Sequence, residues 1–144
     1  MSKKAILIDT GFWLGLFDPE DSYYKESCDL LELIKLEHYT LLLPFPCLYE
    51  IIRTKYVKNK VRLAAFDSFI KSNTVEFIYD EAYRDQALEK VFSLNKHAPI
   101  THSLVDSIIR EMISDINLKL DYLITYNAKD FADICAKRHL KILS

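Results

Sequence analysis

The chain has 144 residues, of which 50% are hydrophobic, 28% are charged, two are glycine and four are proline. This composition differs from that of disordered segments and supplies enough apolar side chains for a full core, so we expect a single domain over residues 1–144. The formal net charge is −2, which gives no long-range attraction to phosphate backbones or anionic membranes and argues against a nucleic-acid binder of the histone or zinc-finger kind. Nucleic acid as a substrate is not excluded by this balance.

The cysteines and the apolar runs indicate a cytoplasmic protein. Cys28, Cys47 and Cys135 are odd in number and widely spaced, without a C-x-x-C pair, so they fit neither a disulfide framework nor a cysteine zinc site. A reducing cytosol is therefore the expected compartment. The first apolar run, residues 5–8, is too short for a signal-peptide core or a membrane span, and we expect no membrane partner.

The first half of the chain alternates short apolar runs with amphipathic segments. Wholly apolar runs predict strands buried on both faces, as in a parallel sheet, and apolar side chains at helical spacing predict helices. Pro44 and Pro46 stop the second run, and Pro46 is well placed as the first residue of a helix. The expected elements are strands at 5–8 and 39–43 and helices at 22–36, 46–57 and 59–72.

The second half repeats the alternation. Its long apolar stripe runs from Val105 through Ile108, Ile109 and Met112 to Ile116. The expected elements are strands at 74–79, 121–125 and 140–143 and helices at 81–94, 102–117 and 128–137. Strands that alternate with helices predict an α/β fold, a three-layer α/β/α sandwich with a central, mainly parallel sheet.

Four acidic residues follow predicted strands or begin predicted helices. In open parallel sheets the functional crevice lies beyond the carboxyl ends of the strands, so polar residues at these places are candidates for the site. They come from four separate stretches of the chain. The candidates are Asp9, Glu50, Asp106 and Asp130.

Three of these acids also have a purely structural explanation. Asp9 fits the N-cap of a helix that begins at Thr10. Asp106 fits the acidic member of a capping box begun by Ser103, and Asp130 fits the same role behind Asn127. For each of these three residues taken alone, the capping role and a role in the functional site both stay open.

Glu50 lies too deep in its predicted helix to cap it, and it flanks apolar positions, so it needs a partner. Two carboxylates about 4 Å apart repel by roughly 4 kcal/mol at the effective dielectric of a protein surface. If the four acids converge, they must protonate or hold a cation. Oxygen ligands without cysteine select Mg²⁺ or Mn²⁺, and this equipment is typical of metal-assisted phosphodiester hydrolysis.

Four motifs in the chain carry a resemblance to a known family. They are I-L-I-D-T-G-F at residues 6–12, P-x-L-Y-E at 46–50, S-L-V-D-S around Asp106 and L-I-T-Y-N-A-K-D-F at 123–131. With these motifs in this order on these elements, the sequence resembles the PIN-domain ribonucleases, and within them the short VapC toxins of VapBC toxin-antitoxin pairs. The resemblance covers nearly the whole chain and implies a PIN-like fold.

The resemblance also implies which residues form the site. The acids that form the metal site in the family map onto Asp9, Glu50 and Asp106. The family commonly has a fourth acid two residues after the threonine that ends the fourth strand, where this chain has Asn127, and Asp130 lies three residues further on. Asp130 is the first candidate for this position and Asn127 the second.

The residue after the first D-T motif departs from the family, which often has serine or asparagine where this chain has Gly11. Thr10 and Thr125 are therefore the hydroxyl candidates for supporting the acids or a phosphate.

The function implied by the resemblance is a Mg²⁺- or Mn²⁺-dependent endoribonuclease that cleaves single-stranded or structured RNA. Its implied partners are the RNA, a small cognate antitoxin protein and a second copy of the chain in a homodimer. Two alternatives stay open, a stand-alone PIN nuclease in RNA processing and a catalytically silent PIN-fold binding module. A metal-independent ribonuclease that uses His97 and His102 as acid and base is a further alternative.

Two other groups of residues have less specific explanations. The densest basic stretch fits either a grip on the substrate or a solvated helix face, and it comprises Arg53, Lys55, Lys58, Lys60 and Arg62. The aromatic residues Phe12, Trp13 and Phe17 fit packing in a core or a dimer interface better than a platform for nucleobases.

Overall fold

The computed structural model describes residues 3–72, 75–96 and 101–144. Within these ranges the strands form one five-stranded sheet in the order β3-β2-β1-β4-β5, and every neighbouring pair is parallel. The strands are β1 (Lys4–Ile8), β2 (Tyr39–Pro44), β3 (Val75–Ile78), β4 (Tyr122–Ile124) and β5 (Lys141–Leu143). The predicted α/β class is confirmed, with a sheet that is parallel throughout; the expected start of the third strand at Thr74 lies outside the described residues.

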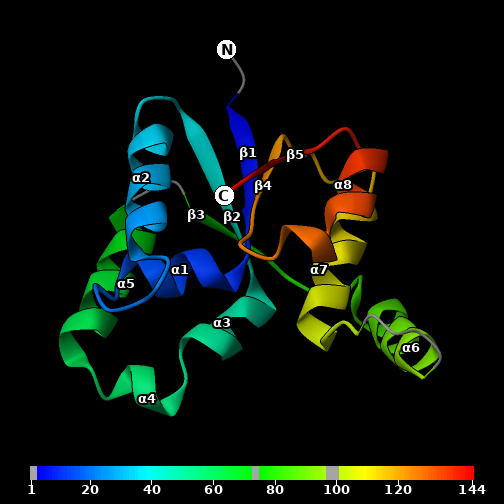
Figure 1. The fold of residues 1–144 in the computed structure, drawn as a ribbon, viewed down its shortest axis with the longest axis horizontal. Coiled ribbons are helices and arrows are strands. Elements are labelled where there is room, and N and C mark those ends of the chain that lie inside the picture. Colours follow the sequence, from blue (N-terminus) through cyan, green and yellow to red (C-terminus); the bar gives the residue numbers. More distant parts are fainter. Residues whose placement is uncertain (1–2, 73–74, 97–100) are drawn as a thin grey trace.

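Helices cover both faces of this sheet, as the predicted three layers require (Figure 1). One face carries α1 (Thr10–Leu16), α2 (Tyr24–Lys35), α3 (Phe45–Ile51), α4 (Thr54–Val57) and α5 (Lys60–Ser72). The other carries α6 (Arg84–Asn95), α7 (Leu104–Ser114), the short 3₁₀ helix η1 (Ala128–Asp130) and α8 (Ala132–Lys137). In the part of the chain that the structure describes, no helix is both long and apolar enough to cross a bilayer.

The strands are buried because their apolar runs face helices on both sides. Ile6, Leu7 and Ile8 of β1 are fully buried, and so are Leu123 and Ile124 of β4. The two edge strands are exceptions, since each is paired on one side only: the central residues of β3 are exposed, and no residue of β5 is fully buried. The central strands are therefore buried in the core, and the loops that follow their carboxyl ends extend from this part of the sheet.

The aromatic side chains of α1 pack in the core, which is one of the two roles predicted for them. Phe12 and Trp13 are fully buried, and the Trp13 ring makes edge contacts with Phe66 and Phe69 of α5 at 5.7 Å. Phe17 contacts the same two rings. These contacts hold the helix that begins directly after Asp9 in place.

The helix predicted over residues 46–57 is wrong in one respect, since it is two helices. Ile52 ends α3 with a backbone that is no longer helical, and Arg53 is extended before α4 begins. In one continuous helix, Ile51 and Tyr56 would point about 140° apart, because each residue turns the helix by about 100°. The break allows both side chains to be buried.

The long helix α7 ends three residues earlier than predicted. Asp115 leaves the helix with an extended backbone, and its carboxylate accepts hydrogen bonds from the backbone N–H of Asn117 and from the Tyr83 hydroxyl. Ile116 was expected on the apolar stripe but is 81% exposed and lies beyond the helix. The stripe itself is correct as far as Met112, which is fully buried.

Candidate active site

Asp9 lies where the order of the sheet reverses. The chain passes from β1 to β2 on one side and returns to β4 on the other, and in sheets of this kind ligands bind at this switch point, beyond the carboxyl ends of the strands. The backbone N–H of Asp9 donates to the carbonyl of Ile124, at 3.0 Å, which ties the ends of β1 and β4 together. Its side chain caps α1 by accepting from the N–H of Thr10, at 2.7 Å, so the capping explanation holds for Asp9.

Two buried threonine hydroxyls orient two of the acids. Thr125 Oγ1 donates to the second carboxylate oxygen of Asp9, at 3.0 Å. Thr10 Oγ1 donates to Glu50 Oε1, at 2.6 Å, and this is the partner that Glu50 needs beside its apolar neighbours. Each hydroxyl fixes one carboxylate. The first bond connects the residues that follow β4 and β1, and the second connects α1 with α3.

Asp106 lies in the first turn of α7, as the capping box predicts. The Ser103 hydroxyl caps the helix by accepting from the N–H of Asp106, at 3.0 Å. The Asp106 carboxylate accepts no hydrogen bond from any residue in the described ranges. Capping therefore explains the backbone of Asp106 and leaves its carboxylate free.

One open pocket of about 450 Å³ brings these groups together. Its walls include Asp9, Thr10, Tyr49, Glu50, Arg53, Ser103, Asp106 and Asn127. The pKa of Asp9 is raised from 3.8 to about 6, mainly by burial and also by the negative charges of Asp106 and Glu50, although the two hydrogen bonds that Asp9 accepts lower it. Three of the four predicted acids thus line one pocket, and the charges of two of them act on the third.

Of the two candidates for the fourth position, Asn127 lines this pocket and Asp130 does not. The Asn127 N–H donates to Thr125 Oγ1, at 3.1 Å, which holds the start of η1 against the site. Asp130 ends η1 outside the residues that line the pocket, and its carbonyl accepts from Arg110, at 2.7 Å. Arg110 in turn makes a two-pronged ion pair with Asp133, both bonds at 2.8 Å.

The donor set of the pocket suits a hard cation, because the carboxylates of Asp9, Glu50 and Asp106 offer only oxygen. Among the described residues, however, no three His, Cys, Asp or Glu side chains are arranged as a ready-made metal site. Mg²⁺ does not need such a cage, since it keeps several waters and is usually held by one or two carboxylates together with substrate phosphates. The residues present therefore fit Mg²⁺ as a partly hydrated ion.

Tyr126 supports the site from a position that the sequence did not single out. Its ring stacks on Tyr23 with centroids 4.2 Å apart, and its hydroxyl shares a hydrogen bond with Ser27. A Cβ at Gly11 would lie 3.1 Å from the Tyr126 ring. Gly11, the residue that departs from the family, thus leaves room for the ring of Tyr126, the residue directly before Asn127.

The basic stretch is divided between the site and the surface. Arg53 is exposed and lines the acidic pocket. Arg62 turns away to pair with Asp18, at 3.4 Å, and to cover the Tyr56 ring. Of the five basic residues in this stretch, Arg53 alone is among the described residues that line this pocket.

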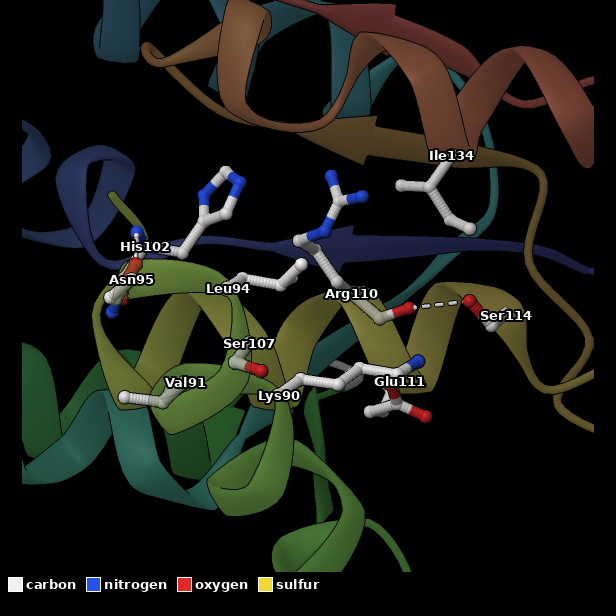
Figure 2. Close-up of a pocket in the computed structure, with 10 residues that line it drawn as sticks. All are labelled: Lys90, Val91, Leu94, Asn95, His102, Ser107, Arg110, Glu111, Ser114 and Ile134. Atoms are coloured by element: carbon white, nitrogen blue, oxygen red, sulfur yellow. Dashed lines mark hydrogen bonds and ion pairs between the residues drawn. The ribbon is translucent and has the colours of Figure 1, made fainter. Parts of the chain in front are cut away.

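The histidine alternative points to a different place. His97 lies outside the described residues. His102 lines a second cavity of about 150 Å³ between α6 and α7, shown in Figure 2, and this cavity contains none of the four predicted acids. Asn95 holds the backbone of His102 through two hydrogen bonds, and Lys90 pairs with Glu111 at the rim.

Comparisons with known proteins find similarity in structure only. No protein-family model and no curated protein sequence matches the chain. VapC20 of Mycobacterium tuberculosis, a toxin that cleaves the sarcin-ricin loop, superposes with a TM-score of 0.64 at 17% identity, over 89% of this chain and 94% of that one. VapBC2 of Rickettsia felis, solved bound to a promoter DNA fragment, superposes with a TM-score of 0.60 at 19% identity, over 96% of both chains. The chain therefore has the fold of the VapC toxins, and the predicted PIN-like architecture is confirmed.

Proposed function

We propose that the chain is a Mg²⁺-dependent endoribonuclease and the toxin of a toxin-antitoxin pair. The observation that carries the proposal is the pocket in which Asp9, Glu50 and Asp106, from three separate elements, meet at the carboxyl ends of parallel strands. The shared fold with VapC20 and VapBC2 supports the same function. Among the described residues that line this pocket there is no histidine and no cysteine.

The three carboxylates would hold the ion, with Asn127 as a further oxygen donor in the same pocket. When bound, Mg²⁺ supplies Lewis-acid activation of water and of the scissile phosphate. Mn²⁺ has the same preference for oxygen ligands and is the expected substitute.

The other residues of the pocket orient the acids and the substrate. Thr10 and Thr125 fix Glu50 and Asp9, so these two carboxylates are already placed before RNA binds. The carboxylate of Asp106 accepts no hydrogen bond within the described ranges, which leaves its oxygens available to the ion. Arg53 lies on the wall of the pocket, where its guanidinium can bind a phosphate next to the acids.

The partners that we propose follow from the two structural neighbours. VapC20 is a toxin that cleaves the sarcin-ricin loop, so this RNA loop is the first substrate to test. VapBC2 is a toxin-antitoxin complex, which supports a small cognate antitoxin as the protein partner. A homodimer and a cytoplasmic location complete the proposal.

Metal dependence and the role of the acids can be tested together. Purified wild type should cleave total RNA in Mg²⁺ and not in EDTA, while Asp9→Asn and Asp106→Asn should fold normally and lose cleavage. Asp29→Asn is the matched control, because Asp29 is an exposed carboxylate that pairs only with Lys25 in the described structure.

Equal cleavage in EDTA, or activity in both pocket variants, would contradict the proposal. Wild type that binds RNA without cleaving it in Mg²⁺ or Mn²⁺ would favour the silent binding module. Cleavage without any antitoxin encoded beside the gene would favour the stand-alone processing nuclease.

A further inference from the structure

Four aromatic side chains form an exposed cluster beside the acidic pocket, and we name it the aromatic platform: Phe45, Tyr49, Phe77 and Tyr79. Phe45 is its centre. The Phe45 ring stacks on Tyr79 with centroids 5.4 Å apart and an angle of 25°, and it meets Tyr49 and Phe77 edge-on at 5.8 and 6.1 Å. Tyr49 is 72% exposed, Tyr79 63% and Phe77 36%.

The platform lies at the same edge of the sheet as the acids. Phe45 and Tyr49 are one turn apart on α3, the helix that follows β2, and Tyr79 lies just beyond the carboxyl end of β3. Tyr49 also lines the acidic pocket, and the next residue in the chain is Glu50. The aromatic surface is therefore continuous with the pocket through a single side chain.

The folded chain gains little from leaving these rings in water. The core already contains buried aromatic side chains such as Trp13 and Phe66, and burying a large aromatic ring stabilises a fold relative to leaving it exposed. Clustered apolar groups on a surface are typical of binding sites. The chemistry next to this cluster then indicates the ligand.

That chemistry favours a nucleobase over a protein side chain. Unpaired bases stack on exposed tyrosine and phenylalanine rings, and this stacking tolerates any base because every base has a π face. Arg53 lies on the pocket wall four residues after Tyr49 in the chain, where it can bind a phosphate of the same strand. A chain with bases, phosphates and a scissile bond would contact the platform, Arg53 and the acids in one continuous path.

We propose that the aromatic platform stacks an unpaired nucleobase of the RNA that enters the acidic pocket, an inference that rests on the proposed ribonuclease function. Tyr49 and Tyr79 are the residues that present the stacking surface, and Phe45 supports them from beneath. The substrate must therefore expose a splayed base beside the cleaved phosphodiester, as single strands and loops do and regular duplexes do not.

The test uses a uridine octamer with one central 2-aminopurine, whose fluorescence is quenched when it stacks on an aromatic ring. Binding is measured in metal-free buffer at low ionic strength, so that no cleavage occurs. The wild type should quench the probe, Tyr49→Ala should weaken binding about tenfold and remove the quenching, and Tyr49→Phe should retain both. Phe92→Ala is the matched control, because Phe92 is a 57% exposed ring on α6, outside the platform.

The outcomes separate this inference from the proposed function. Quenching that is absent in wild type, or unchanged in both Tyr49→Ala and Tyr79→Ala, overturns the platform, whereas Mg²⁺-dependent cleavage of total RNA is measured independently. A Tyr79→Ala protein that becomes a monomer while wild type is a dimer in light scattering also overturns it, since the rings would then form a subunit interface. Tyrosine-dependent quenching without any cleavage keeps the platform and overturns the nuclease.

Discussion

Replacing Asp9 with asparagine should stabilise the metal-free protein although it removes activity. The substitution keeps the shape of the side chain, and asparagine caps a helix about as well as aspartate. The bond from the Thr10 N–H, at 2.7 Å, can therefore persist to the amide oxygen. What changes is the charge, which in the wild type is buried opposite Asp106 and Glu50.

The size of the effect follows from the pKa of Asp9, which burial and the two neighbouring carboxylates raise from the ordinary 3.8 to about 6. One pKa unit is worth about 1.4 kcal/mol, so the ionised side chain lowers the free energy of unfolding by about 3 kcal/mol. Because the folded pKa is above the unfolded one, this cost is complete above pH 7 and is relieved as the pH falls through 6 toward 4. The gap between variant and wild type should be about 3 kcal/mol at pH 8 and about half of that at pH 5.

Urea unfolding in EDTA at pH 5, 6, 7 and 8, followed by circular dichroism, measures this gap. An asparagine variant that is less stable than wild type at pH 8, or a gap that does not shrink toward pH 5, would refute the reasoning. Added Mg²⁺ should then stabilise wild type more than the variant, because a ligand that binds the folded state raises its stability.

Two further substitutions test how the site and its frame are held. Thr10→Val should lower RNA cleavage about 10- to 100-fold with little loss of stability, since it removes the hydroxyl that orients Glu50, and Thr10→Ser should restore most of the activity; a valine variant with wild-type rates would contradict this. Gly15→Ala should lower the free energy of unfolding by about 1–3 kcal/mol in urea, because the new Cβ would lie 2.6 Å from Ser27 Oγ and 3.1 Å from the Tyr23 carbonyl; an unchanged unfolding midpoint would show that α1 and α2 can separate freely.

The strands could be predicted from the sequence because a parallel sheet buries both faces of each strand. A short, wholly apolar run such as residues 6–8, in a chain that alternates such runs with helical segments, therefore indicates a strand of such a sheet. The break after Ile51 could not be predicted, because it depends on where the core lies relative to Tyr56. The early end of α7 depends in the same way on the bond from Tyr83, 32 residues away, to Asp115.

The site was predictable as far as the topology dictates it. Strand ends meet at one edge of the sheet, and this rule alone brings Asp9 to the pocket that Glu50 and Asp106 share. The choice between Asn127 and Asp130 could not be made, because it depends on the turn through η1. The spacing of residues along the chain does not define the directions in which their side chains point from a tight turn.

The aromatic platform shows a second limit of the same kind. Phe45 and Tyr49 have helical spacing. Phe77 lies on β3 and Tyr79 just beyond it, and only the register of β2 and β3 brings these two residues to Phe45. Within α3 alone, Tyr49 is one more aromatic residue in an apolar segment. That Tyr49 is exposed and belongs to an aromatic cluster can be recognised only in the folded structure, where β3 lies next to β2.

The net charge of −2 acquires a different meaning once the acids are located. Three of the negative charges lie in one pocket, so they act on a phosphate at short range and are not spread over the surface. Without a cation they repel the RNA backbone, and contacts that do not depend on charge must then supply the affinity. The platform offers such contacts at the rim, and a cation held by the acids would reverse the local sign of the charge where the phosphate must lie. A mildly acidic protein can thus act on RNA if base stacking binds the strand and the metal, not the surface charge, attracts the phosphate.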